Sequence, residues 1–117
     1  MLVFLMGCAA APIFKSYQTP EDTFKTWRQA VERLDLQAVT ECYAVGAQPG
    51  LRKEIVTTSK EGLEAMQRET RDTTFEIQKI IFEDRRAYLR VERKRKGTTE
   101  IEVVNMVKES NGWKLLP

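Results

Sequence analysis

The sequence predicts an α+β fold in which N-terminal helices pack on a curved four-stranded antiparallel sheet. Two patterns carry this prediction. In the first half of the chain apolar residues recur every three or four positions, as in amphipathic helices, whereas from residue 73 they alternate with polar residues, as in strands. Turn residues then divide the second half into four runs. At 117 residues the chain has room for one domain with a modest core.

The first helix is expected to begin after Thr19, whose side chain can cap it, with Pro20 at its first position and Asp22 completing a capping box. Asp35 is expected to cap a second helix. The inward faces of the two helices are predicted to carry Phe24, Trp27, Val31, Leu34, Leu36, Val39, Cys42 and Tyr43.

After a break over 46–50, we expect a short helical turn over 51–56 and a separate helix from Ser59 to about Thr70, with Leu63 and Met66 inward. The strands are predicted at about 73–83, 86–96, 99–109 and 113–116. The turns between them are expected at Asp84-Arg85, at Gly97-Thr98 and at Asn111-Gly112, where Asn-Gly is the strongest hairpin signal.

These turns predict a register in which opposite charges face each other, namely Arg95 with Glu100 and Arg93 with both Glu102 and Glu76. This charged face is expected to be solvated. The core is expected on the opposite face, which carries Phe75, Ile77, Ile81, Tyr88, Ile101, Val103, Val107 and Leu116. The charged face also has an apolar half, predicted as a dimer or partner surface: Ile80, Phe82, Leu89, Val91, Val104 and Met106.

Composition excludes several functions. The net charge of +2 does not favour a nucleic-acid binder, and the absence of histidine removes the commonest general base near neutral pH and the commonest zinc ligand. We expect no catalytic set, no metal and no cofactor. A binder of anionic lipid or glycan remains an alternative, through basic residues of the sheet: Arg85, Arg86, Arg90 and Lys94.

The start of the chain, Leu5-Met6-Gly7-Cys8, resembles the lipobox of bacterial lipoproteins. The resemblance implies a signal remnant at 1–7, a lipidated Cys8 with a tether over 8–18 and a domain over 19–117. It also implies a lipid-anchored envelope protein, on the outer membrane facing the periplasm in a two-membrane organism because Ala9 follows the cysteine. The missing basic segment before the apolar run leaves two alternatives: the true start lies upstream and Met1 is an internal methionine, or the first seven residues are not a signal. Cys42 is expected to be a buried packing residue, although a disulfide with Cys8 stays open if Cys8 is not lipidated.

The segments Thr19–Phe24, Ala30–Asp35 and above all Val107–Leu115 resemble small bacterial lipoproteins of the nuclear transport factor 2-like superfamily. This group of cystatin-like α+β cones includes ketosteroid isomerase and polyketide cyclase relatives. The resemblance implies a cavity at the mouth of the cone and dimerisation through the sheet. The pocket candidates are Trp27, Tyr43, Phe75 and Tyr88.

These observations favour a non-catalytic domain that binds a protein partner or a small apolar ligand. The alternative that the resemblance adds is an enzyme of the isomerase or dehydratase type, with an acidic base in the cavity. A carboxyl group beside a tyrosine hydroxyl in a deep cavity would favour the enzyme, and a filled core would exclude it.

Overall fold

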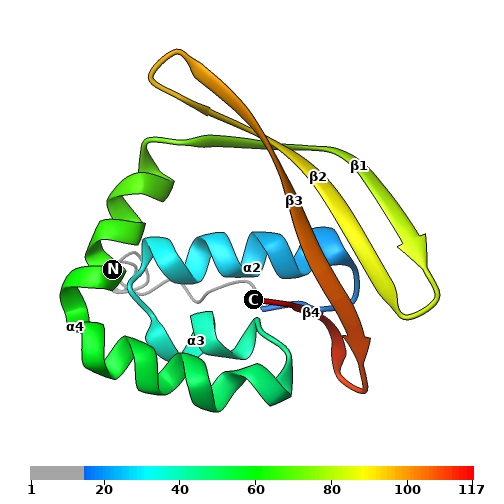
Figure 1. Cartoon of the computed structure of the whole chain (residues 1–117), viewed down its shortest axis with the longest axis horizontal. Coiled ribbons are helices and arrows are strands. Elements are labelled where there is room, and N and C mark those ends of the chain that lie inside the picture. The colour runs from blue at the N-terminus through cyan, green and yellow to red at the C-terminus, as the bar shows by residue number, and fades with distance from the viewer. Residues whose placement is uncertain (1–14) are drawn as a thin grey trace, which may run out of the picture.

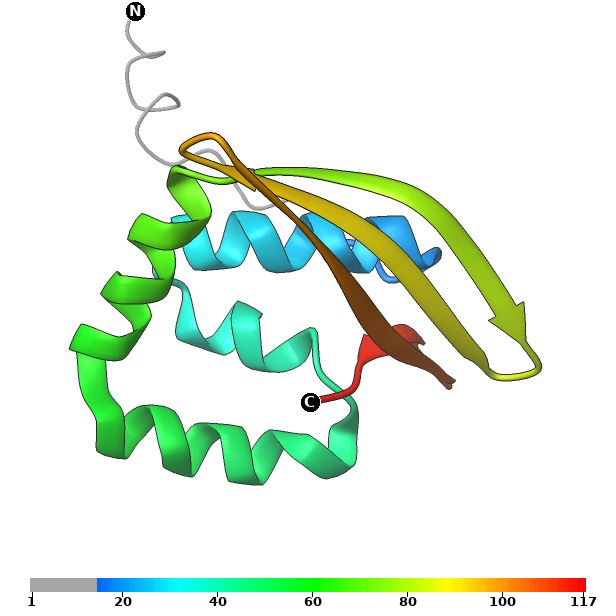
Figure 2. The same ribbon diagram turned by 45° about the horizontal axis from the view of Figure 1, so that its top comes forward.

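The structure is a computed structural model that describes residues 15–117, apart from the side chains of residues 54–60. Its elements are, in order, α2 (Pro20–Glu32), α3 (Leu36–Glu41), the 3₁₀ turn η1 (Val45–Ala47), α4 (Gln48–Arg71), β1 (Thr74–Glu83), β2 (Arg86–Arg95), β3 (Thr98–Glu109) and β4 (Gly112–Leu115). The strands form one antiparallel sheet in the order β1-β2-β3-β4. Figures 1 and 2 show the sheet curving over α2, with all helices on that side. The predicted fold class is confirmed.

The first two helices begin where their caps predict. The Thr19 side chain accepts a hydrogen bond from the Asp22 amide at 3.1 Å, and Asp35 accepts one from the Ala38 amide at 3.0 Å. The Asp22 carboxylate does not close a capping box. It accepts a hydrogen bond from the Ser16 hydroxyl at 2.9 Å instead, and so holds the incoming chain against α2.

The third helical region differs from the prediction, because α4 is one helix of 24 residues rather than a turn followed by a second helix. Pro49 lies in its first turn, where a missing N–H costs nothing. Leu63 is buried as expected, whereas Met66 is 38% exposed. The described part of the chain contains no helix that is both long enough and apolar enough to cross a bilayer.

Two of the three hairpin turns lie one residue earlier than predicted. Arg95 pairs with Thr98 across Lys96-Gly97, and Glu109 pairs with Gly112 across Ser110-Asn111. Both residues of the first turn have positive φ, 49° and 81°, as a tight hairpin requires. The β2–β3 register therefore brings Arg93 opposite Glu100 rather than Glu102.

The assignment of the two sheet faces was wrong. The face that packs on the helices, here the concave face, carries seven residues from the predicted charged face or its apolar half. Three of them, Leu89, Val91 and Met106, are fully buried. The seven are Ile80, Leu89, Val91, Arg93, Glu102, Val104 and Met106. The predicted partner surface is thus largely the core. Phe82, on the edge strand β1, lies beside this core. It is 57% exposed, and its ring contacts Trp113.

A β-bulge explains part of this inversion. The register of β1 against β2 shifts between Ile77 and Lys79, so Phe75 and Ile77 share the concave face with Ile80. The same shift places Glu76 opposite Glu92 instead of Arg93. On the convex face lie three residues that were predicted to be core but are 45–60% exposed: Ile81, Ile101 and Val103.

The last residues assigned to the tether belong to the folded body. The Tyr17 carbonyl accepts a hydrogen bond from the Trp113 amide at 2.8 Å, so the incoming chain lies along β4. Lys114 is 2% exposed. Its ammonium donates to the Glu41 carbonyl at 2.6 Å and lies 3.7 Å from the centre of the Tyr17 ring. Cys8 and the rest of the predicted signal and tether lie outside the described residues.

Cys42 is a buried packing residue, as predicted. It is fully buried, and its thiol is free and donates to the Ala38 carbonyl at 3.3 Å. Burial raises the pKa of this thiol to about 12. The group is therefore a neutral part of the core at neutral pH and not a reactive nucleophile.

Candidate functional site

A pocket of about 310 Å³ lies between α2 and the concave side of β3, and the end of the chain forms its third wall. Phe24 and Trp27 come from one face of α2 because they are three residues apart, and their rings stack at 5.9 Å. The volume falls at the small end of the roughly 300–1,000 Å³ typical of ligand pockets. The lining is Phe24, Trp27, Tyr43, Glu102, Val103, Val104, Asn105, Leu115, Leu116 and Pro117.

One end of this pocket is polar. The Trp27 indole N–H is buried and has no hydrogen-bond acceptor in good geometry among the described residues. Burial raises the pKa of the Tyr43 phenol, and the nearby Trp27 N–H partly offsets this rise. The charge of Cys42, present only once its thiol ionises at high pH, and the charge of Glu102 add to the rise. Tyr43 is therefore a protonated hydroxyl at neutral pH. It can donate a hydrogen bond to a guest.

Glu102 supplies the carboxylate of this site. It lies on the concave face of β3, and one of its oxygens is 3.6 Å from the Arg93 guanidinium. Its side chain is 43% exposed, so the carboxylate stands at the mouth of the pocket and not at its base. The predicted charge pair between Arg93 and Glu102 is thus present, although as diagonal neighbours and on the face that was expected to be solvated.

The structure brings together two of the four predicted pocket residues, Trp27 and Tyr43. Phe75 lies beyond Phe24, with its ring edge-on at 5.6 Å, and lines a different hollow. Tyr88 pairs with Ile81 and Asn105 on the convex face, and it lines neither hollow, so its assignment to the pocket is wrong. Glu102 was missed because its charge, together with Arg93 and Glu100, indicated a solvated face.

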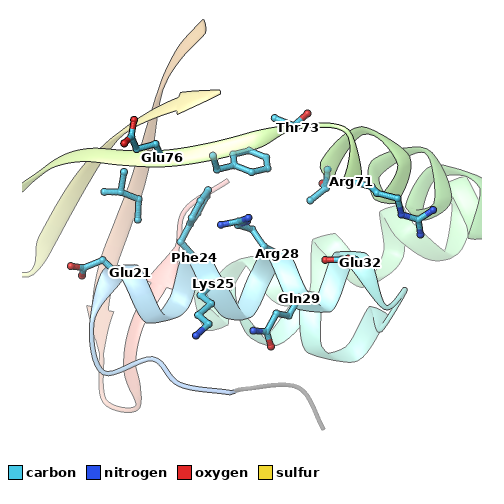
Figure 3. Close-up of a pocket in the computed structure, with 12 residues that line it drawn as sticks. Glu21, Phe24, Lys25, Arg28, Gln29, Glu32, Arg71, Thr73 and Glu76 are labelled. Carbon is cyan, nitrogen blue, oxygen red and sulfur yellow. The ribbon is translucent and has the colours of Figure 1, made fainter. Parts of the chain in front are cut away.

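A second and larger hollow of about 660 Å³ lies between α2, the end of α4 and β1. Figure 3 shows Phe24 and Arg28 pointing from α2 toward β1, while Lys25 and Gln29 point away from it. The Arg28 guanidinium lies 5.1 Å from the centre of the Phe75 ring. Arg93, opposite Phe75 on the neighbouring strand β2, lies 5.9 Å from the centre of the same ring and is paired with Glu69 at 2.9 Å.

The described residues contain no group of three or more metal-ligating side chains. Three of the four basic residues of the alternative prediction, Arg85, Arg90 and Lys94, are engaged locally. Arg85 donates to the Lys108 carbonyl at 2.8 Å, Arg90 donates to Gln78 at 3.3 Å, and Lys94 pairs with Glu92 at 3.3 Å. Each of these three cations therefore has an acceptor within the chain itself.

No family model matches the chain, and no curated protein matches its sequence. Among solved structures, the chain is similar to an NTF2-like protein of unknown function from Cytophaga hutchinsonii. The match has 10% sequence identity and a TM-score of 0.46, and it covers 87% of this chain and 92% of that chain. The fold described above stands on the helices and strands of this chain alone.

Proposed function

We propose that this domain is a nuclear transport factor 2-like binding module whose pocket between α2 and β3 holds a small, largely apolar molecule with a hydrogen-bonding group. The observation that carries the proposal is the Trp27 indole N–H, which is buried at the wall of an aromatic pocket. Among the described residues it has no acceptor in good hydrogen-bond geometry, although the Tyr43 phenol lies near it. A buried donor without a partner costs about 1–3 kcal/mol, and a guest with an acceptor oxygen would recover it.

The lining fits such a guest. Phe24, Val104 and Leu115 offer apolar walls, and Trp27 with Tyr43 offers donors at one end. Pockets that bind small molecules commonly combine a mostly apolar lining with a few polar groups that fix orientation. A hydroxyl on the guest can also donate to Glu102 at the mouth.

2-Naphthol is a suitable probe, since it has a flat apolar body and one hydroxyl. We expect saturable binding by calorimetry, and we expect Val104→Phe to abolish it by filling the pocket. Ile101→Phe is the matched control, because Ile101 lies on the same strand but on the exposed convex face. Binding that survives Val104→Phe, with both variants folded by circular dichroism, would exclude the pocket.

The enzyme remains a second candidate, because Glu102 and Tyr43 line one pocket and the carboxylate adds to the rise in the phenol pKa that burial causes. This is the pairing of groups that a proton-transferring isomerase uses, with the carboxylate as base and the phenol as donor. The test is exchange of an acidic C–H proton of a bound ketone with deuterium oxide. We expect it to stop in Glu102→Gln if the chain is an enzyme, and to be absent from the wild type if the chain only binds.

We also propose that Cys8 is lipidated and anchors the domain to the cell envelope. Residues 15–18 pack on the body, so at most six residues, 9–14, would separate the lipidated cysteine from it. Six residues reach at most roughly 22 Å, so the domain would stay close to the membrane. Palmitate labelling with Cys8→Ser as the control tests this, and an unlabelled wild type would overturn it.

A homodimer through the sheet is a further proposal, now on the convex face. Ile81, Ile101 and Val103 are 46%, 45% and 60% exposed there, which is unusual for three apolar side chains on one side of a sheet. We expect the mass in solution to fall from dimer to monomer in Val103→Lys. A wild type that is monomeric at high concentration would contradict it.

A further inference from the structure

The hollow between α2 and β1 contains a cation that nothing in the described structure pairs. Arg28 is half-buried, its Nε is buried without a hydrogen-bond acceptor, and no described carboxylate lies within 4.0 Å of it. Its contact with the Phe75 ring at 5.1 Å is a cation–π interaction. Such a contact does not use the N–H groups of the guanidinium, which remain available to donate hydrogen bonds.

Arg93 provides a comparison, because its guanidinium forms ion pairs within the fold. That residue contacts the same aromatic ring from 5.9 Å, but it is paired with Glu69 at 2.9 Å and with Glu102 at 3.6 Å. Buried or half-buried arginines are normally paired in this way, because removing the charge from water is costly. Arg28 lacks this compensation although carboxylates stand on the rim of its hollow.

We propose that the hollow at Arg28 binds an organic carboxylate with an aromatic or apolar body. The carboxylate would accept two hydrogen bonds from the Arg28 guanidinium, a geometry that arginine favours. The body would lie against the apolar wall formed by Phe24, Phe75 and Ile77. Figure 3 shows Phe24 and Arg28 directed to the same side of α2, which places the wall beside the charge.

The rim selects a monoanion over a phosphate dianion. Three carboxylates and three cations line the hollow: Glu21, Glu32, Glu76, Lys25, Arg28 and Arg71. Because three carboxylates stand on the rim and the Lys25 side chain points away from β1 (Figure 3), the site has no excess positive charge with which to hold a second negative charge. The site lies across Phe24 from the pocket proposed above, so it is independent of that proposal.

The test is calorimetric titration with phenylacetate, its neutral isostere phenylacetamide, acetate and inorganic phosphate. We expect phenylacetate to bind at least about tenfold more tightly than each of the other three, and to weaken as salt is added. Arg28→Gln should reduce its affinity by at least about tenfold. Arg86→Gln, which removes one cation from the exposed convex side, should leave the affinity unchanged.

Trp27→Phe separates this site from the pocket between α2 and β3. We expect it to leave phenylacetate binding intact while it weakens 2-naphthol. The proposal is overturned if phenylacetate does not bind, if phosphate or phenylacetamide binds as tightly, or if Arg28→Gln folds normally and keeps the wild-type affinity. It is equally overturned if Arg86→Gln weakens binding as much as Arg28→Gln, since the effect would then be one of net charge.

Discussion

The two ends of the concave face differ in how completely they are filled. At the end beside β4, Leu89, Met106 and Ala87 are fully buried and Trp113 is 7% exposed. At the end beside the β2–β3 turn, the face carries Arg93 and Glu102. Three N–H donors near it are buried and find no acceptor among the described residues: Trp27 Nε1, Arg28 Nε and Arg93 Nε. We infer that the filled end supplies the stability of the fold and the open end its binding capacity.

The largest expected effect is at the filled end. Leu89→Ala removes three carbons from a side chain with no exposure, and we expect the free energy of unfolding to fall by about 2–5 kcal/mol. Val103→Ala, on a side chain 60% exposed on the convex face, should change it by no more than about 0.5 kcal/mol. Chemical denaturation measures both. Equal losses would mean that the faces are assigned incorrectly.

The contact between β4 and the incoming chain gives the next effect. Gly112 has a φ of +120°, and a Cβ there would lie 2.7 Å from the Cβ of Tyr17 and collide with its carbonyl oxygen. Gly112→Ala should therefore cost about 1–3 kcal/mol. Gly50→Ala meets no atom within 4 Å and lies in a helix, so it should be neutral or stabilise by up to about 1 kcal/mol. A neutral Gly112→Ala would show that residues 15–18 do not dock.

The burial of the Cys42 thiol should make the free energy of unfolding depend on pH. The Cys42 pKa is about 12 in the folded protein against 9.0 for the free group, so between these values the folded state holds the extra proton. Stability from this group is complete below pH 9 and falls as pH rises, by about 1.4 kcal/mol per unit. Burial lowers the Lys114 pKa, and this acts in the opposite direction in both proteins. Because the Cys42 charge partly offsets that lowering, the Lys114 effect is no smaller in Cys42→Ala than in the wild type.

Denaturation under reducing conditions at pH 8, 9 and 10 measures this dependence. The wild type should lose stability between pH 9 and 10, whereas Cys42→Ala should lose much less over that interval. Tyr17, whose pKa burial raises to about 12, begins to contribute only near pH 10, the value for the free phenol. Parallel curves for the two proteins would contradict the burial of the thiol.

The smallest effect compares the two arginines of the open end. Arg93→Gln removes pairs with Glu69 and Glu102 and should cost roughly 0.5–1 kcal/mol, because these pairs are partly exposed. Arg28→Gln removes no ion pair. It loses the contact with the Phe75 ring but also removes a half-buried charge that lacks an ion pair, so the free energy of unfolding should be unchanged or slightly higher. If Arg28→Gln costs as much as Arg93→Gln, then Arg28 is already satisfied within the fold.

The features that could be predicted from the sequence are those set by residues close together in the chain. Thr19 and Asp35 cap helices as expected, the Asp84-Arg85 turn is where the sequence places it, and Cys42 is packed in the core. These features depend on residues a few positions apart, for which composition and spacing are direct evidence. Two pocket residues, Trp27 and Tyr43, followed from the same helical periodicity.

The faces of the sheet could not be predicted from the alternation alone. Both faces carry apolar residues. The concave face also carries Arg93, Glu100 and Glu102, because the helices cover only part of its length, and these charges indicated a solvated face. The bulge between Ile77 and Lys79 then reversed half of β1, and no residue in that segment signals it. The same error hid Glu102, which is a pocket residue only because its face is concave.

The central claim is that the open end of the cone binds a guest at Trp27. The chain has two tryptophans, Trp27 in the pocket and Trp113 in the filled end, so a nitrogen–proton correlation spectrum contains two indole signals. On titration with 2-naphthol we predict that the Trp27 indole signal moves downfield to a saturable limit as it gains an acceptor, while the Trp113 signal stays in place. Two stationary signals, or two that move together, would contradict the claim.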